Sequence, residues 1–273
     1  MMKTHTYICF CRGDSRSGNL AAIVQDFAGD DFEKQALASK LNLPVTVFIE
    51  NTKAEIRALR FFYPTSESVL CLHGALAAAK CLMQLRKTDI IKVKIRSGQI
   101  LQMMKQGDRV QVFMPQAEIL AVKPDAMIIA KMLHIDADQL DSNLPYVAAS
   151  LGSPKLVVPI KNAEILNHLQ PDFDFIKKWS IEHQINGLYV YSADVPSGVD
   201  FIARGFNPKG GWNEDAATGV AAGTLISVLP HPTQKDFVID QGDTMGEPSR
   251  IYVSLVEDEQ VLVGGEVHET TCK

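Results

Sequence analysis

Short apolar runs interrupted by polar residues predict a chain of many β-strands and a few helices. Runs rich in β-branched and aromatic residues are typical of strands. We expect strands at residues 7–10, 45–49, 58–62, 90–96, 110–114, 155–160, 187–192, 200–204, 236–240 and 250–255. A helix is expected from Asp30 or Asp31 onward, where an aspartate can cap its first turn. Its inward side would carry Phe32, Leu37 and Leu41.

Two further helices are predicted to be buried on every side. Residues 72–85 and 218–229 are apolar on most of the helical circumference. A helix without a polar face has to be covered by other elements all round. Alanine and glycine in both segments allow neighbouring strands to approach closely. We therefore expect each helix to form the centre of a packed domain.

The two apolar helices follow matching sequences. From Arg60 the chain reads Arg-Phe-Phe-Tyr-Pro, and from Arg204 it reads Arg-Gly-Phe-Asn-Pro. A polar loop and a glycine-containing helix start follow in both places. The two arginines are 144 residues apart, and Gly74 and Gly219 are 145 apart. A separation of half the chain predicts two copies of one unit, the alternative being coincidence between two β-loop-α segments.

The repeat predicts an α+β fold of two pseudo-symmetric domains, each a curled, mostly antiparallel sheet around a central helix. The boundary is expected between Pro115 and Pro124, where the sequence Met-Pro-Gln-Ala-Glu interrupts the strand pattern. The first domain would then cover residues 1–116 and the second residues 117–260. A last strand within residues 261–273 is expected to return to the first domain.

Composition and charge exclude several classes of protein. The chain has 273 residues, enough for two domains, with 46% hydrophobic and 22% charged content, as in ordinary globular proteins. Its net charge of -5 and the lack of a basic patch argue against nucleic acid as a partner. The one basic stretch, residues 91–96, alternates with period two and predicts the solvent side of a half-buried strand.

Sequence patterns for membranes, metals and nucleotides are missing. No long uncharged apolar run occurs, and residues 1–12 are too polar for a signal peptide, so we expect no membrane association. The five cysteines are odd in number, irregularly spaced and without a Cys-x-x-Cys pair. They predict reduced thiols in a cytoplasmic protein with no metal site. No Gly-x-Gly-x-x-Gly or Walker pattern follows a strand, so no nucleotide cofactor is expected.

The starts of the two apolar helices are the candidate ligand site. A helix start presents unpaired N–H groups and the positive end of the helix dipole, which together bind anions. If both starts face one cleft, a small anionic or carboxylate-bearing ligand would bind between the halves. The side chains at the two starts are Glu67, Cys71, His73, Glu214, Asp215 and Thr218. A two-thiol racemase mechanism is disfavoured because residues 212–220 contain no cysteine.

Several motifs, in order along almost the whole chain, resemble those of the PhzF-like (phenazine biosynthesis) family. Residues 206–223 contain Glu-Asp-Ala-Ala-Thr-Gly, similar to the family's Glu-Asp-Pro-Ala-Thr-Gly. Residues 17–22 resemble its Gly-Asn-Pro-x-Ala motif, and residues 67–75 its Glu-x-x-Leu-Cys-Gly-His-Ala-Thr segment. Residues 241–249 resemble its closing motif.

The resemblance implies a diaminopimelate-epimerase-like fold, commonly assembled as a homodimer, with the site between two domains. It also implies a biosynthetic isomerase that needs no cofactor and moves a proton between carbons of a small unsaturated acid. In such enzymes the glutamate of an Asn-Leu-Ser-Glu-Thr motif is the general acid/base. Histidine, aspartate and serine arrange the substrate.

This chain departs from the family at the acid/base position. The motif reads Asn-Leu-Pro-Val-Thr here, so Val45 stands in place of the glutamate. The family's serine is replaced by Val220, and the glycine before its histidine by Leu72. Valine carries no exchangeable proton, so the family mechanism cannot run unchanged. His73 and Asp215 remain as the expected catalytic residues.

Substrate binding is assigned to residues that the helix starts and the resemblance indicate. These are Asn19, Glu67, Gly74, Thr218 and Gly219.

The proposed site residues have structural alternatives. Asp215 suits a helix N-cap, and His73 suits a buried histidine with one backbone bond. Asn19 suits a turn, since it follows Gly18, and Glu67 suits a solvated loop. Glu67 is also a candidate for the missing base.

Two functions remain open at this point. The first is a PhzF-like isomerase with an altered acid/base set. The second is a non-catalytic small-molecule-binding or regulatory protein that keeps the cleft without the chemistry.

Overall fold

The computed structural model describes residues 2–13, 17–51, 54–144, 146–230, 234–256 and 260–270. The chain forms two compact units. Unit 1 consists of Met1–Phe113 and Gly264–Lys273, and unit 2 of Met114–Val263. Strands β8 and β17 each include residues of both units.

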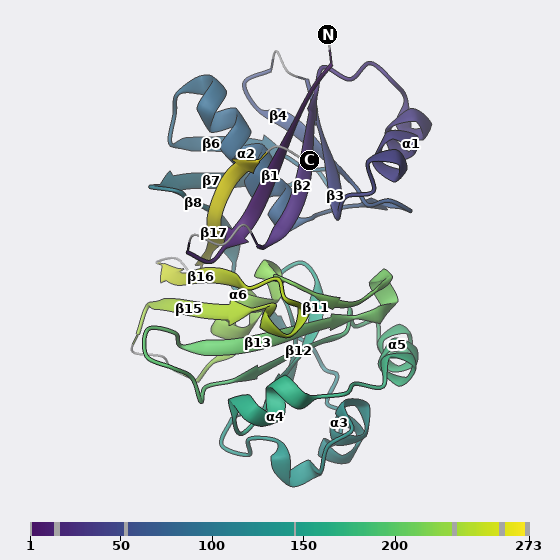
Figure 1. Cartoon of the computed structure of the whole chain (residues 1–273), viewed down its shortest axis with the longest axis vertical. Coiled ribbons are helices and arrows are strands. Elements are labelled where there is room, and N and C mark those ends of the chain that lie inside the picture. The colour runs from purple at the N-terminus through teal and green to yellow at the C-terminus, as the bar shows by residue number, and fades with distance from the viewer. Residues whose placement is uncertain are drawn as a thin grey trace. The chain divides into compact units, whose positions relative to one another are not determined.

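Unit 1 is a curled sheet with one helix on its inner face and one on its outer face (Figure 1). Its elements are β1 (Lys3–Cys11), β2 (Asn19–Gln25), α1 (Asp31–Leu41), β3 (Val45–Glu50), β4 (Arg57–Phe62), β5 (Glu67–Ser68), α2 (Leu72–Arg86), β6 (Ile90–Lys94), β7 (Ile100–Gln106), β8 (Arg109–Pro115) and β17 (Gln260–Thr270).

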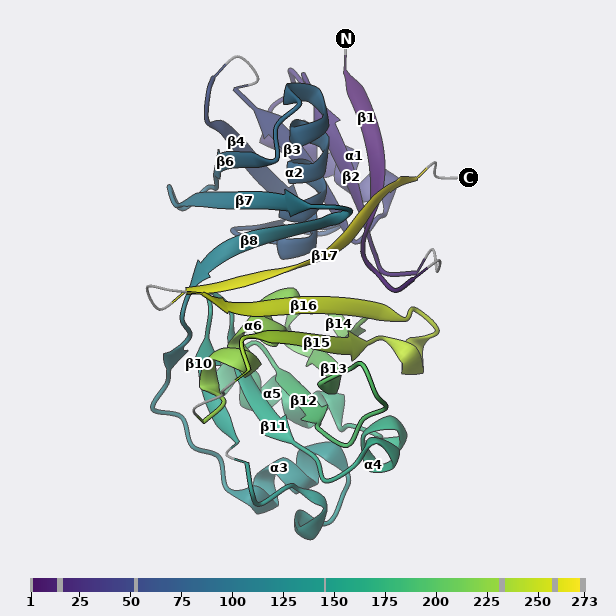
Figure 2. The same cartoon turned by 90° about the vertical axis from the view of Figure 1, so that its left-hand side faces the viewer.

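Unit 2 repeats this plan with more helices on the outer face of its sheet (Figure 2). Its elements are β9 (Glu118–Ile119), α3 (Ala126–Leu133), η1 (Ala137–Gln139), β10 (Val147–Ser150), β11 (Pro154–Pro159), α4 (Ala163–His168), α5 (Phe173–Glu182), β12 (Leu188–Ser192), β13 (Phe201–Asn207), η2 (Pro208–Gly210), β14 (Trp212–Asp215), α6 (Gly219–Val228), β15 (Asp236–Gln241), η3 (Asp243–Met245) and β16 (Ser249–Val256).

The strand pairings of the two units match one by one. In unit 1, β1–β2 is antiparallel, β2–β3 parallel, β3–β4 and β4–β5 antiparallel, β4–β6 parallel and β6–β7 antiparallel. In unit 2 the series β10–β11, β11–β12, β12–β13, β13–β14, β13–β15 and β15–β16 has the same senses in the same order. The predicted α+β fold of two pseudo-symmetric, mostly antiparallel halves is confirmed.

The two apolar helices occupy equivalent places in this plan. Helix α2 follows β5 and contacts β1, β2, β3, β4, β6 and β7. Helix α6 follows β14 and contacts β10, β11, β12 and β16. Residues 74–83 of α2 and residues 221–226 of α6 are buried without a break. The prediction that these helices are enclosed is confirmed, except in the last turn of α2, where Leu85 is 55% exposed.

The outer faces of the sheets carry the remaining helices. In unit 2, helices α3, α4 and α5 cover one core cluster with Leu156, Val158 and Phe206 of the sheet. In unit 1, helix α1 adds Ala38 and part of Leu37 to a smaller cluster.

Helix α1 begins as expected but faces differently. Asp30 caps it in a reciprocal capping box, in which the backbone N–H of Glu33 donates to Asp30 Oδ1 at 2.9 Å. Phe32 was expected to point inward and is 82% exposed. Only one side of this short helix reaches the sheet, and Ala38 occupies the contact instead.

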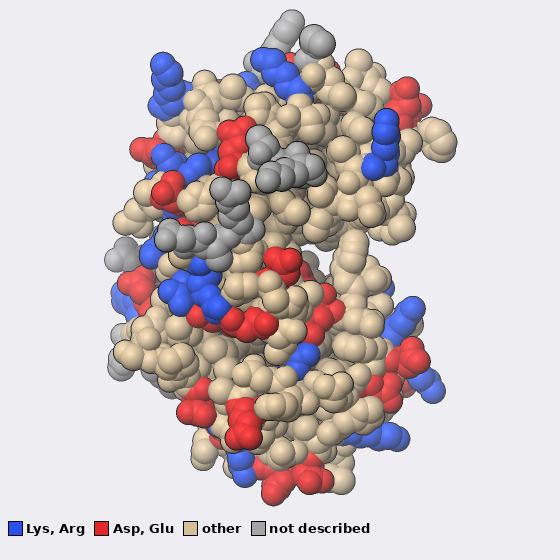
Figure 3. All heavy atoms as spheres, viewed as in Figure 1, with Lys and Arg blue, Asp and Glu red and all other residues tan. Residues whose placement is uncertain are grey.

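The basic stretch of residues 91–96 lies in and just after β6. Ile91 and Val93 are buried, whereas Lys92 and Lys94 are exposed, so the predicted half-buried strand is confirmed. Lys and Arg side chains are interspersed with Asp and Glu on the face seen in Figure 3. Among the described residues, no helix has the length and hydropathy that a membrane crossing requires.

Because α2 is buried except in its last turn, a Leu→Ala substitution should lower the free energy of unfolding by different amounts at two positions in the helix. Leu76 is fully buried, so Leu76→Ala should lower the free energy of unfolding by about 2–5 kcal/mol. Leu85→Ala, in the exposed turn of the same helix, should cost less than about 1 kcal/mol. Urea unfolding followed by circular dichroism measures both. Equal losses at the two positions would contradict the enclosed helix.

Candidate functional site

Each unit positions its helix start with a short hairpin braced by an arginine–glutamate pair. In unit 1, Arg60 of β4 donates to Glu67 of β5. In unit 2, Arg204 of β13 forms a bidentate pair with Glu214 of β14, both N–O distances being 2.8 Å. The two guanidinium groups lie over Phe62 and Phe206, at 5.4 and 5.0 Å from the ring centroids. The Arg-x-Phe repeat therefore holds the hairpin that leads into each buried helix.

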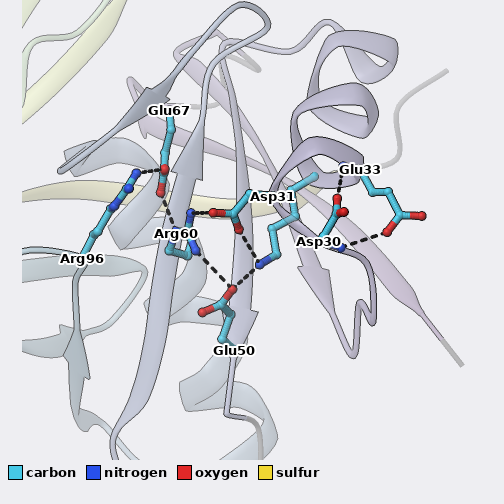
Figure 4. Close-up of polar contacts among 8 residues, drawn as sticks. Asp30, Asp31, Glu33, Glu50, Arg60, Glu67 and Arg96 are labelled. Atoms are coloured by element: carbon cyan, nitrogen blue, oxygen red, sulfur yellow. Dashed lines mark hydrogen bonds and ion pairs between the residues drawn. The ribbon is translucent and has the colours of Figure 1, made fainter.

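Glu67 is occupied by these structural contacts. Its two carboxylate oxygens accept from Arg60 and Arg96, as Figure 4 shows. Arg60 also donates to Asp31 Oδ2 at 2.9 Å, and the hydrogen bond that it donates to Glu67 is the main reason that the pKa of this arginine is raised. The contacts favour a bracing role for Glu67. Its assignment to substrate binding stays a prediction.

The start of α2 brings together two cysteines and His73. Cys71 is the N-cap residue, and its Sγ lies 3.3 Å from Nδ1 of His73. The Cys9 thiol donates to the carbonyl of His73 at 3.2 Å. Burial, with smaller contributions from the neighbouring thiols Cys11 and Cys71, raises the pKa of Cys9 well above its usual range. The described cysteines are free thiols, and Cys272 lies outside the described residues.

Asn19 lies beside this group. It begins β2, pairs with Cys9 across the β1–β2 ladder, and is only 6% exposed. The expected turn precedes it: Gly18 has φ +128, and a side chain there would meet the Cys9 carbonyl at 2.4 Å. Unit 1 thus gathers Asn19, Cys9 and the start of α2 in one place.

Val45 packs against the first turn of the same helix. It is fully buried at the start of β3. A carbon added to Gly74 would lie 3.1 Å from Cγ1 of Val45 and 2.9 Å from Cγ2 of Val47. The position that the family resemblance assigns to a glutamate is therefore next to the start of α2, and here it is filled by an apolar contact with Gly74.

Asp215 lies at the corresponding place in unit 2, in a small hydrogen-bonded network. It is the last residue of β14, and its Oδ2 accepts from the Thr218 hydroxyl at 2.9 Å. Gln241 donates to the Asp215 carbonyl at 2.7 Å and accepts from the Thr218 N–H at 3.1 Å. Tyr189 donates to the same Gln241 oxygen at 3.2 Å. The carboxylate is thus fixed beside the first turn of α6, where Gly219 follows.

The N-cap alternative for Asp215 does not hold. Thr218 occupies the N-cap position of α6, three residues further along the chain. Gly242 supports the intervening turn: its φ is +87, and an added carbon would lie 2.8 Å from the carbonyl oxygen of Ala216. Asp215 is therefore held by a side-chain network rather than by capping its helix.

Lys155 is a buried cation that the sequence pattern did not reveal. It is 3% exposed within β11, and its ammonium donates to the backbone carbonyl of Asn186. Burial lowers the pKa of Lys155 to about 8, while the charge of Asp215 acts in the opposite direction. Burial, and then Asp215, raise the pKa of Tyr189. The sequence predicted only a strand at residues 155–160, and no pattern in that run indicated a buried charge.

The site residues fall into two groups, one in each unit. Asn19, His73 and Gly74 lie together in unit 1, as do Asp215, Thr218 and Gly219 in unit 2. That both groups line one cleft stays a prediction. Within the described segments, no cluster of three or more His, Cys, Asp or Glu residues is arranged to hold a metal ion.

Comparison with known proteins gives the family. The profile of the PhzC-PhzF family, described as phenazine biosynthesis-like protein, matches residues 13–270. An uncharacterized isomerase of Clostridium acetobutylicum is 30% identical over 264 residues, covering 89% of this chain and 87% of that protein.

Solved structures share the fold. A phenazine biosynthesis protein of the PhzF family from Bacillus anthracis superposes with a TM-score of 0.82 at 20% identity, covering 99% of this chain and 100% of that one. A predicted epimerase from Pseudomonas aeruginosa gives 0.81 at 25% identity, covering 98% and 96%. The fold is therefore diaminopimelate-epimerase-like. The protein is of the isomerase class. The chain belongs to the phenazine biosynthesis-like, PhzF family.

The lowered pKa of Lys155 predicts a pH-dependent stability. Between pH 8 and 10.5 the unfolded chain holds a proton that the folded chain has released, so stability rises with pH in this window. Between these two pH values the free energy of unfolding of the wild type should increase by roughly 3 kcal/mol relative to that of Lys155→Met. Urea unfolding at several pH values measures the difference. Lys161→Met, at an exposed lysine, is the control, and a flat difference for Lys155→Met would contradict the buried ammonium.

Proposed function

We propose that this chain is a cofactor-independent isomerase that moves a proton between two carbons of a small unsaturated carboxylic acid. Family membership supports the reaction class. The observation that carries the proposal is the Asp215 carboxylate, held beside the start of α6 by the hydroxyl of Thr218 at 2.9 Å. A fixed carboxylate next to the N–H groups of a helix start suits proton transfer to and from an acid that those N–H groups bind.

The proposed chemistry balances without an oxidant or a cofactor. Asp215 removes a proton from a carbon next to the carbon–carbon double bond of the substrate. The electron pair of that C–H bond forms the new double bond, and the old double bond shifts its electrons to a more distant carbon. That carbon takes up a proton, from His73 or from the protonated Asp215. The product has the composition of the substrate.

The binding assignments follow the two helix starts. The substrate carboxylate is proposed to accept from backbone N–H groups at Gly74 and Gly219, with Asn19, Glu67 and Thr218 as further contacts. From the family resemblance we also propose a homodimer, a biosynthetic role and a cytoplasmic location.

Val45 is the observation that favours a second candidate. Its side chain fills the acid/base position with an apolar contact to Gly74. A protein that binds small carboxylates without chemistry would keep both helix starts and tolerate this valine. The isomerase proposal instead requires that Asp215 and His73 carry out the proton transfer without an acid/base group at position 45.

Solvent exchange separates the two candidates. The wild type is incubated in deuterated water with but-3-enoate and cyclohex-2-ene-1-carboxylate, and deuterium entering the carbon positions is followed by NMR. Asp215→Asn should lower the rate by about a hundredfold to ten-thousandfold. Asp174→Asn, at an exposed aspartate of the same unit, should leave it unchanged. Equal rates in wild type and Asp215→Asn would remove the assignment, and binding without exchange would favour the second candidate.

A further inference from the structure

Lys155 is the one buried cation in unit 2 whose role neither the fold nor the proposed site has explained. Buried Lys34 and Lys80 of unit 1 form ion pairs with Glu50 and Asp108. For Lys155, the described residues supply only the carbonyl of Asn186 as a hydrogen-bond acceptor. Burial of an ammonium group without an ion pair is costly. Such a group is retained where its charge is used.

The strand register places Lys155 on the face of the sheet that carries the Asp215 network. Leu156 and Val158 belong to the outer core cluster, so alternation along β11 turns Lys155 to the inner face. Val157 shares that face and pairs with Tyr189. Tyr189 pairs with Gly205, which in turn pairs with Asp215.

Two glycines lie between β11 and β14, at positions where neighbouring atoms leave no room for a side chain. Gly187 precedes β12 with φ +79, and an added carbon there would meet the carbonyl oxygen of Phe206 at 1.9 Å. At Gly205 an added carbon would lie 2.5 Å from the Thr218 hydroxyl. Neither position admits a side chain, and the space beside Gly205 is taken by Thr218 and Gln241.

The other elements packed on this face bring few ionisable groups. Helix α6 and strand β10 have none, because their sequences are Gly-Val-Ala-Ala-Gly-Thr-Leu-Ile-Ser-Val and Val-Ala-Ala-Ser. Strand β12 contributes the hydroxyls of Tyr189 and Tyr191, both buried. Asp215 is the acidic group whose charge acts on Lys155, and it acts on Tyr189 as well.

We propose that Lys155 is a positioning residue for the isomerisation, its buried ammonium being the fixed counter-charge that faces the Asp215 carboxylate. This role rests on the proposed function of Asp215. The ammonium of Lys155 is held by its hydrogen bond to the Asn186 carbonyl. The carboxylate of Asp215 is held by the hydrogen bond that it accepts from the Thr218 hydroxyl. Removal of the Asp215 charge should therefore change the titration of Lys155, and removal of the Lys155 charge should change the exchange rate that depends on Asp215.

The first experiment needs no activity. The Nζ resonance of Lys155 is titrated by NMR in the wild type and in Asp215→Asn. Because the carboxylate is the charge that raises the pKa of Lys155 against burial, Asp215→Asn should move the titration from about pH 8 to a lower pH. Asp174→Asn should leave it in place. Identical titrations in wild type and Asp215→Asn would overturn the proposal.

The second experiment uses the deuterium exchange of but-3-enoate as a function of pH. Lys155→Met, similar in length and without charge, should exchange at least about tenfold more slowly and lose the limb of the profile near pH 8. Lys155→Arg keeps a charge that does not titrate. It should therefore exchange faster than Lys155→Met but still lack the limb of the pH profile near pH 8. Lys161→Met is the control. Circular dichroism checks that each variant is folded.

The outcomes separate this role from the function on which it rests. A wild type that exchanges while Lys155→Met shows the same rate and profile would overturn the role of Lys155 and leave the isomerase intact. A wild type without exchange would overturn the isomerase and, with it, the positioning role of Lys155 in the reaction. The Nζ titration would then still decide whether the two charges are coupled.

Discussion

An apolar helix has to be shielded from water on all sides, and this requirement shapes both units. Each sheet curls round one such helix, α2 in unit 1 and α6 in unit 2. The helix start cannot move without opening the core behind it. His73 is therefore positioned by the packed start of α2, and Asp215 by the hydrogen-bonded network beside the start of α6. Preorganised groups of this kind are what proton transfer requires.

The arginine–glutamate hairpins complete this constraint. The strand that ends in Arg-x-Phe turns back on itself before the helix begins, and Arg60 and Arg204 hold the returning strand through Glu67 and Glu214. The same solution in both halves explains why the Arg-x-Phe-x-Pro pattern recurs half a chain apart. The repeated residues therefore have the same structural role in both units.

The sequence was informative where a property extends over many residues. Two uninterrupted apolar helices and a repeated motif were enough to predict the fold class and to place His73 and Asp215 among the candidates at the helix starts. The family resemblance then singled out these two. Single residues were harder to interpret. Phe32 was expected inside because it is apolar, yet helix α1 offers only one side to the sheet. Lys155 was predicted only as the first residue of a strand, because alternation along a single run does not tell which face of the sheet a helix covers.

Two groups of residues, one at each helix start, are expected to bind the same carboxylate. The most direct test is an NMR titration of the backbone amides of ¹⁵N-labelled protein with cyclohex-2-ene-1-carboxylate. The account predicts that amides of residues 73–75 and 218–220 shift together along one saturation curve. Shifts confined to other segments, or to only one of the two helix starts, would contradict it.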